Sequence, residues 1–329
     1  MDPHAVPLLR RADLVERGWH SRRVRRELDV GFLRAIRPGM YARAADVDGL
    51  SREEKIVVKA RALARTSGSP PVFCGLTAAA LLGLPCLRDD GGLHVLTAES
   101  RPSSGAGVVR HRSLTEGTEL MEVEGLHCTP LARTMADVAR AETREVSVSI
   151  ADAALRARAF SSPGRYDVED AERLREEALS WARTSPRGRR AAEKVLLFAD
   201  GRAQLPGESV SRLRLHDLGF APPSLQVGVP GPHGNTYWVD FGLDDVAAWG
   251  EFDGRVKYRG IAAAEGKTPQ RVIEEEKRRE DWIRGTTRRH VARWGWEDLG
   301  DAATLGLRLA AFGITPPRGG AQSVHRGAQ

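Results

Sequence analysis

Three carboxylates lie in a stretch of sequence that otherwise predicts two buried β-strands. The segment YWVDFGLDDVAAWGEFDGRVKYR, residues 237–259, contains Asp240, Glu251 and Asp253. Neighbouring acids in a half-buried sheet repel one another unless a cation, a proton or a basic partner offsets their charge. Magnesium favours such a pair of carboxylates together with water and phosphate oxygens. The pattern therefore indicates metal-dependent chemistry on a phosphodiester, with Mg²⁺ or Mn²⁺ as the expected cofactor.

The turn between the two strands sets how these acids face each other. The Asp-Asp pair at 244–245 suits a two-residue turn. That turn would place Asp240 opposite Trp249, and Glu251 opposite Trp238. Because side chains alternate along a strand, one face would then carry five of them: Trp238, Asp240, Trp249, Glu251 and Asp253. The alternative is that this side of both strands faces solvent and the acids are simply exposed.

The elements around these strands resemble a known nuclease fold. The resemblance is to the Vsr-like branch of the PD-(D/E)xK nuclease superfamily over roughly 205–300, where an Asp on one strand precedes apolar-Glu-x-Asp-Gly-x-x-His on the next and a helical Glu comes first. Asp240, Glu251 and Asp253 match these acids, and Glu208 matches the helical Glu. Lys257 stands where the branch has its His.

This resemblance implies a restriction-endonuclease-like α/β domain at 205–314, with a mixed sheet flanked by helices. It implies that Asp240, Glu251 and Asp253 hold one or two divalent ions, and that Lys257 stabilises the attacking hydroxide or the pentavalent phosphate. The charged helix that begins near TPQRVIEEEKRRED, at 268–281, would bring Glu276 and Lys277 near the site. The helix could equally be an ion-paired cover on the sheet.

The N-terminal 48 residues predict a winged helix-turn-helix. AVPLLRRADLVERGW predicts a helix that includes Leu8 and Leu9 and stops at Gly18. HSRRVRRELDVG predicts a second, amphipathic helix with Ser21 as its N-cap and a stop at Gly31. FLRAIRPGMYARA then predicts a strand, a turn and a strand, as in a wing. The order of helix, turn, helix and wing is typical of a DNA-binding module.

Basic residues follow the same elements. Arginines in the first half of a recognition helix reach base edges, and those on a wing reach phosphates or the minor groove. The alternative is a solvated basic helix in an Arg-rich protein. The candidate contacts to double-stranded DNA are Ser21, Arg22, Arg23, Arg25, Arg26, Arg34 and Arg37.

A second resemblance covers residues 8–160. IRPGMYA, GLTAAALLGLP and VEGLHCTPLARTMADVA are similar to segments of the actinobacterial AbiE-type (type IV) antitoxin family, and residues 49–160 would form its α+β domain. The resemblance implies a repressor of its own operon and, in true antitoxins, neutralisation of a cognate toxin. From the residues alone, Ser51 and Glu54 predict a capping box, and Thr129 predicts the N-cap of a later helix. Arg133 and Asp137 are four apart on that helix, which fits an intrahelical ion pair as well as it fits the family motif.

The remaining segments and the composition narrow the fold class and the expected location of the protein. Residues 161–204 predict a helical connector that breaks at Ser185-Pro186, and 315–329 predict a disordered tail. The 329 residues are 41% hydrophobic and 29% charged, with a net charge of +6. Three scattered cysteines argue against a zinc ribbon or a disulfide framework, and no long apolar run is present. We expect a cytoplasmic, multidomain α+β protein that does not enter membranes.

Three functions fit the sequence. The first is a winged helix that binds duplex DNA, joined to a nuclease that cuts it in a toxin-antitoxin or phage-defence setting. The second is a transcriptional regulator of the antitoxin type that keeps the nuclease fold only as a scaffold. The third is a structural adaptor that does not bind nucleic acid. Magnesium binding separates the first from the second, and salt-dependent DNA affinity separates both from the third.

Overall fold

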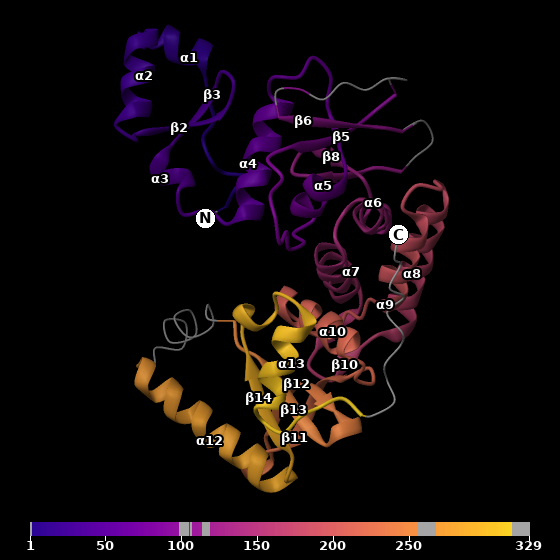
Figure 1. The fold of residues 1–329 in the computed structure, drawn as a ribbon. Coiled ribbons are helices and arrows are strands. Elements are labelled where there is room, and N and C mark those ends of the chain that lie inside the picture. Colours follow the sequence, from indigo (N-terminus) through magenta and orange to yellow (C-terminus); the bar gives the residue numbers. More distant parts are fainter. Residues whose placement is uncertain (1, 99–104, 106, 114–118, 255–267, 318–329) are drawn as a thin grey trace, which may run out of the picture. The chain divides into compact units, whose positions relative to one another are not determined.

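The computed structural model of the chain describes residues 2–317 except 99–104, 106, 114–118 and 255–267 (Figure 1). It divides into two compact units: Met1–Ala154 with Glu172–Ala199, and Leu155–Ala171 with Asp200–Gln329. Helices and sheets occur in both, which confirms a multidomain α+β protein. The five segments expected from the sequence are finer than these two units and stay predictions.

The first unit begins with two short helices and a small sheet, which Figure 1 shows together in indigo. The sheet has the order β1-β3-β2 and is antiparallel throughout. Leu14, Val24, Leu33 and Tyr41 form its core with the helices. The elements are β1 (Leu9–Arg10), α1 (Arg11–Glu16), α2 (Ser21–Asp29), β2 (Leu33–Arg37), β3 (Met40–Arg43) and α3 (Ala44–Val47).

Two local predictions in this segment are wrong. Leu9 lies in strand β1, because it pairs with Tyr41 of β3, a partner far along the chain. The N-cap of α2 is His20, and Ser21 is the first helical residue; the Ser21 hydroxyl accepts a hydrogen bond from Arg11 at 2.6 Å instead of capping the helix. The helix stops are correct, since Gly18 and Gly31 have φ angles of 76° and 77°.

A second sheet, of order β6-β5-β4-β8-β7, follows in the same unit. The predicted capping box of α4 is confirmed: the Ser51 hydroxyl accepts from the Glu54 amide at 3.2 Å, and the Glu54 carboxylate accepts from the Ser51 amide at 2.6 Å. The elements are α4 (Arg52–Ala64), β4 (Val72–Phe73), α5 (Gly75–Leu81), β5 (Leu93–Thr97), β6 (Val108–Arg112), β7 (Met121–Val123), β8 (Leu126–Cys128) and α6 (Leu131–Ala141).

The motif that resembles the antitoxin family lies at the start of α6. The Thr129 and Thr134 hydroxyls share a buried hydrogen bond of 2.7 Å, and the N-cap is Pro130, not Thr129 as the sequence suggested. The predicted ion pair of Arg133 with Asp137 is present at 3.7 Å. These contacts stabilise the start of α6.

Three helices complete this part of the chain: α7 (Arg144–Ala159), α8 (Val168–Arg183) and α9 (Arg189–Phe198). Helices α7 and α8 each continue from one unit into the other. The predicted break at Ser185-Pro186 is confirmed between α8 and α9, and α9 packs against α6.

The second unit is built on a four-stranded sheet of order β11-β12-β13-β14. The first two pairings are antiparallel and the last is parallel, so the predicted mixed sheet is confirmed. The elements are β9 (Phe160–Ser162), β10 (Arg165–Tyr166), α10 (Pro206–Leu218), β11 (Ser224–Pro230), η1 (Pro232–Gly234), β12 (Thr236–Leu243), η2 (Asp244–Val246), β13 (Ala248–Phe252), α12 (Pro269–Thr287), β14 (His290–Trp294), η3 (Trp296–Asp298) and α13 (Ala302–Ala310).

Helices α10, α12 and α13 pack against this sheet. Ile283 of α12 joins Val229, Val239, Trp249 and Val291 of the sheet in one apolar cluster. Helix α10 packs on β13 and on α13. Gly207 is required at the start of α10, because a Cβ there would lie 2.1 Å from the ring of Phe252. None of the described helices is both long and apolar enough to cross a membrane.

The turn between β12 and β13 differs from the prediction. It is a short 3-10 helix, Asp244–Val246, followed by Ala247 in the left-handed region at φ 49°. Gly242 therefore pairs with Trp249, two residues out of the expected register. The sequence could not show this, because a non-glycine residue with positive φ is uncommon and nothing marks Ala247 as one.

The predicted common face is also wrong. Val239, the neighbour of Asp240, packs in the apolar cluster with Trp249. The β12–β13 ladder ends at Phe241 and Gly250, and Gln226 of the adjacent strand β11 has a φ of 50°. Regular alternation is lost where the acids lie. Asp240 and Glu251 nevertheless remain neighbours, as their contacts show below.

Candidate functional site

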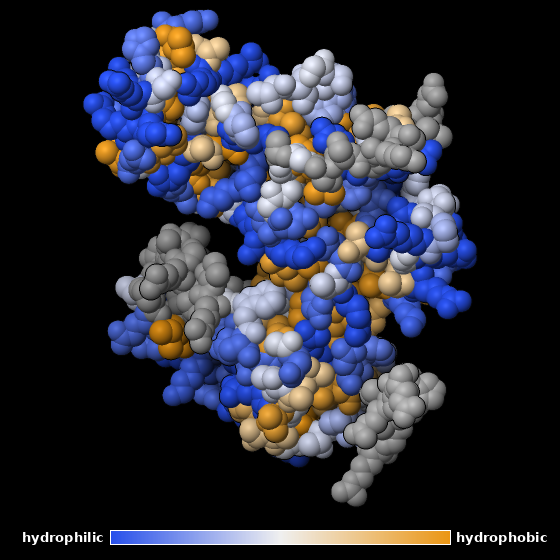
Figure 2. All heavy atoms as spheres, turned by 45° about the horizontal axis from the view of Figure 1, so that its top comes forward, coloured by the Kyte–Doolittle hydropathy of each residue, from blue (hydrophilic) through white to orange (hydrophobic). Residues whose placement is uncertain are grey.

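Helix α2 presents most of the predicted DNA contacts to solvent. Val24 is its only buried residue, and the side chains of Ser21, Arg22, Arg23, Arg25 and Arg26 are all exposed. Figure 2 shows hydrophilic side chains gathered over the α1–α2 end of the chain. An exposed helix with arginine in every turn is a surface that attracts polyanions.

The four arginines of α2 differ in how they are held. Arg23 stacks on Trp19 with 4.2 Å from its guanidinium carbon to the ring centroid, and Arg26 pairs with Glu27 at 2.8 Å. The side chains of Arg22 and Arg25 make no hydrogen bond or ion pair with any residue that the structure describes. These two guanidinium groups are therefore the ones available to phosphate or base edges.

Arg34 and Arg37, the two predicted DNA contacts on the wing, are partly buried and less available to a partner than the arginines of α2. Arg34 makes two charge-assisted hydrogen bonds to Asp48, of 2.9 and 2.8 Å, and a third to the Gly31 carbonyl. Arg37 is half-buried, and burial lowers its pKa. Because Asp48 already neutralises Arg34, this arginine offers less free positive charge than Arg22 or Arg25 does.

Asp240 lies where strands β12 and β13 separate. Its Oδ2 accepts the main-chain amide hydrogen of Phe252 at 2.9 Å, a donor that the interrupted ladder would otherwise leave without a strand partner. Its Oδ1 accepts a longer bond of 3.4 Å from the Gln226 amide. The carboxylate thus fixes the splayed strands, which is a structural role.

Gln226 connects Asp240 to Glu208. Its side-chain amide also donates to Glu208 Oε2 at 3.2 Å, and its Oε1 accepts from Gln204 at 2.7 Å. Glu208 is 1% exposed on α10 and accepts the Gln204 main-chain amide at 2.8 Å. The strained backbone of Gln226 is held by these contacts, and such strain often marks a site. Gln226 was missed in the sequence because a lone Gln in a strand carries no motif.

Glu251 is enclosed by arginines. It is 9% exposed; Oε1 accepts from Arg279 of α12 at 2.8 Å, and Oε2 lies 2.8 Å from Arg293 of β14. Both arginines also contact Glu276, which was expected near the site, and Arg293 lies 3.2 Å from Glu280. The two oxygens that a metal ion would need are therefore engaged by cations of the chain itself.

The pKa shifts follow from this enclosure. Burial raises the pKa of Glu251, and the charge of Asp240 adds to the rise, although Arg279 and Arg293 oppose it. Burial also favours the neutral form of Glu276, but the two arginines prevail and lower its pKa. The network is thus an arginine-carboxylate cluster in which cations of the chain take the place of an external one.

Asp253 and Lys277 make no described contact with this arginine-carboxylate cluster. Asp253 is half-buried, and its main-chain amide donates to the Trp294 carbonyl at 2.8 Å. Lys257 lies outside the described residues, and Lys277 is exposed. Within the described part of the chain, no group of three or more His, Cys, Asp or Glu side chains is arranged to hold a metal ion.

The turn acids have structural partners. Asp244 accepts hydrogen bonds from Arg289 at 2.7 Å and from Ser224 at 2.9 Å, which lower its pKa. Asp245 accepts from the Ala221 amide at 2.9 Å. Arg289 also lies over the ring of Trp249, at 4.4 Å from the centroid. These contacts fix the register of the β12–β13 hairpin.

Two Mycobacterium tuberculosis proteins are similar to this multidomain α+β chain. Uncharacterized protein MT2308 and uncharacterized protein Rv2248, from two strains, are each 31% identical to it over 236 residues. The match covers 70% of this chain and 78% of each relative, so the chain belongs to the same family as these two proteins. No protein-family model matches the sequence.

Proposed function

We propose that the protein is a DNA-binding regulator of the antitoxin type, which binds duplex DNA through α2 and keeps the sheet of its second unit as a scaffold. The observation that carries this proposal is the pair Arg22 and Arg25, exposed on one helix and without a side-chain partner among the described residues. The cytoplasm is the expected location, and a cognate toxin is the protein partner that the antitoxin resemblance implies.

Duplex binding by the full chain at several salt concentrations tests this proposal. Arginines that neutralise phosphates release counterions, so the logarithm of the association constant should fall linearly with the logarithm of salt concentration, by roughly 0.9 for each phosphate contact. Fluorescence anisotropy with a labelled duplex measures the slope. An affinity that does not change with salt would contradict binding through α2.

The second candidate is metal-dependent phosphodiester hydrolysis. The observation that favours it is that Asp240 lies close enough to Glu251 for its charge to raise the pKa of Glu251. Gln226 also connects Asp240 to the buried Glu208 on α10. Magnesium at these carboxylates would polarise a phosphate and activate a water molecule. Arg279 and Arg293 would have to release Glu251 first, and for this reason we rank the scaffold above the nuclease.

Calorimetry with Mn²⁺ separates the two candidates. If the sheet is a scaffold, the full chain and its Glu251→Gln variant give the same heat as a control variant, Asp281→Asn, on the exposed side of α12. None of the three should nick supercoiled plasmid. Saturable Mn²⁺ binding that is lost only in Glu251→Gln, together with nicking, would establish the nuclease instead.

A further inference from the structure

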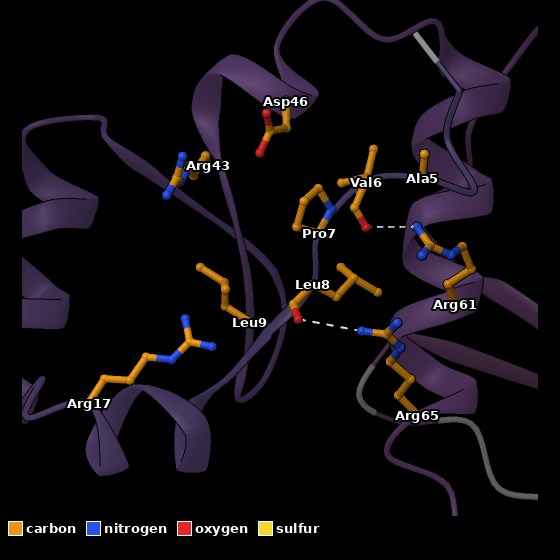
Figure 3. Close-up of a pocket in the computed structure, with 10 residues that line it drawn as sticks. All are labelled: Ala5, Val6, Pro7, Leu8, Leu9, Arg17, Arg43, Asp46, Arg61 and Arg65. Carbon is orange, nitrogen blue, oxygen red and sulfur yellow. Dashed lines mark hydrogen bonds between the residues drawn. The ribbon is translucent and has the colours of Figure 1, made fainter.

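A pocket of about 600 Å³ lies in the first unit (Figure 3), and none of its lining residues comes from α2. Figure 3 shows Arg17 and Arg43, from the ends of α1 and β3, on one side of it, and Arg61 and Arg65, from α4, on the other. The wall between them is apolar and comes from residues 5–9. The volume lies within the usual range for small-molecule sites.

The charge of this pocket is one-sided. Four guanidinium groups line it, against the single carboxylate of Asp46. Asp46 lies in the first turn of α3, where a helix favours a negative charge, so it has a structural reason to be there. The excess of positive charge in a concave site favours an anionic ligand.

Two of the four arginines already have a structural task. Arg61 is half-buried and donates to the Pro3 and Val6 carbonyls at 2.6 and 3.0 Å, and Arg65 donates to the Leu8 carbonyl at 3.4 Å. Burial and the neighbouring charge of Arg65 lower the pKa of Arg61. These bonds hold the N-terminal segment against α4 and so form the apolar wall.

Arg17 and Arg43 do not hold the N-terminal segment in this way. Both are exposed, and neither side chain makes a hydrogen bond or an ion pair with a residue of the described chain. Each offers a planar set of donors that matches the oxygens of a phosphate. Between them and α4 lie Pro7, which is exposed, and Leu9, which is half-buried.

We propose that this pocket binds a small phosphate monoester, whose phosphate is held by Arg17 and Arg43 and whose apolar part lies against Pro7 and Leu9. A monoester suits the site better than a carboxylate does, because it brings nearly two negative charges and three acceptor oxygens to an excess of arginine. The same chemistry could come from a phosphate of the DNA backbone, and the experiment distinguishes the two sources. The proposal does not depend on DNA binding by α2.

Calorimetry with the full chain tests the proposal, with hexyl phosphate and inorganic phosphate as probes. Hexyl phosphate should bind about tenfold more tightly than inorganic phosphate, because its chain buries apolar surface on the wall. The double variant Arg17→Gln/Arg43→Gln should weaken hexyl phosphate binding by about tenfold or more. Both side chains are exposed, so the variant should keep its circular dichroism spectrum and melting temperature.

The pair Arg22→Gln/Arg25→Gln is the matched control, since it removes the same charge from α2. It should bind hexyl phosphate like the parent chain. Equal weakening in both double variants would show attraction to net charge alone and overturn the proposal. It would also be overturned if hexyl phosphate does not bind while the Arg17/Arg43 variant loses affinity for duplex DNA, since the pocket would then contact the DNA backbone.

Discussion

Replacing Arg22 and Arg25 together by glutamine should weaken duplex binding by about 2 kcal/mol or more, roughly thirtyfold. The two side chains are three positions apart on α2, so they share a face, and neither is occupied by another described residue. The salt slope should also become shallower, by about one for each phosphate that the helix no longer neutralises. Fluorescence anisotropy measures both quantities.

A matched variant makes this result specific to α2. Arg17→Gln/Arg43→Gln lowers the net charge by the same amount but alters the pocket beside α4. Its duplex affinity should change little. If both variants lose affinity equally, total charge rather than α2 governs the interaction, and recognition by the winged helix is wrong.

The second large effect is on stability. Glu251→Ala should lower the free energy of unfolding by about 3 kcal/mol, because it leaves the partly buried Arg279 and Arg293 facing each other with less negative charge nearby. The arginines keep Glu276 as a partner, which limits the loss. Urea unfolding followed by circular dichroism measures the change.

Asp281→Asn on α12 is the control for this measurement. Asp281 is exposed and lies 3.9 Å from Arg284, so its removal should cost no more than about 0.5 kcal/mol. If Glu251→Ala is no more destabilising than Asp281→Asn, the arginines do not depend on Glu251. Its carboxylate would then be available to a metal ion, and the nuclease would become the stronger candidate.

Features fixed by neighbouring residues could be predicted from the sequence. The capping box of Ser51 and Glu54 needs only a spacing of three, and the glycine stops at 18 and 31 need only a positive φ. The order of α1, α2, β2 and β3 follows from the same local rules, whereas β1 and α3 were not predicted. The amphipathic pattern of α2 also placed its arginines on the surface correctly.

Features that depend on contacts between residues far apart in the sequence could not be predicted from it. The local sequence around Leu9 favours a helix, but pairing with Tyr41 places Leu9 in a strand. Nothing in the sequence around Ala247 indicates its left-handed backbone. The acids of β12 and β13 were recognised as neighbours that require a positive partner. That the partner is a pair of arginines from α12 and β14 depends on tertiary packing, which spacing along the chain does not encode.

Hydrogen-deuterium exchange of the full chain, with and without duplex DNA, tests the central claim most directly. Binding through α2 predicts slower exchange in residues 21–29, with weaker protection in the wing at 33–43 and no change in the sheet at 224–252. Protection confined to the sheet of the second unit, with α2 unchanged while DNA is bound, would contradict the account.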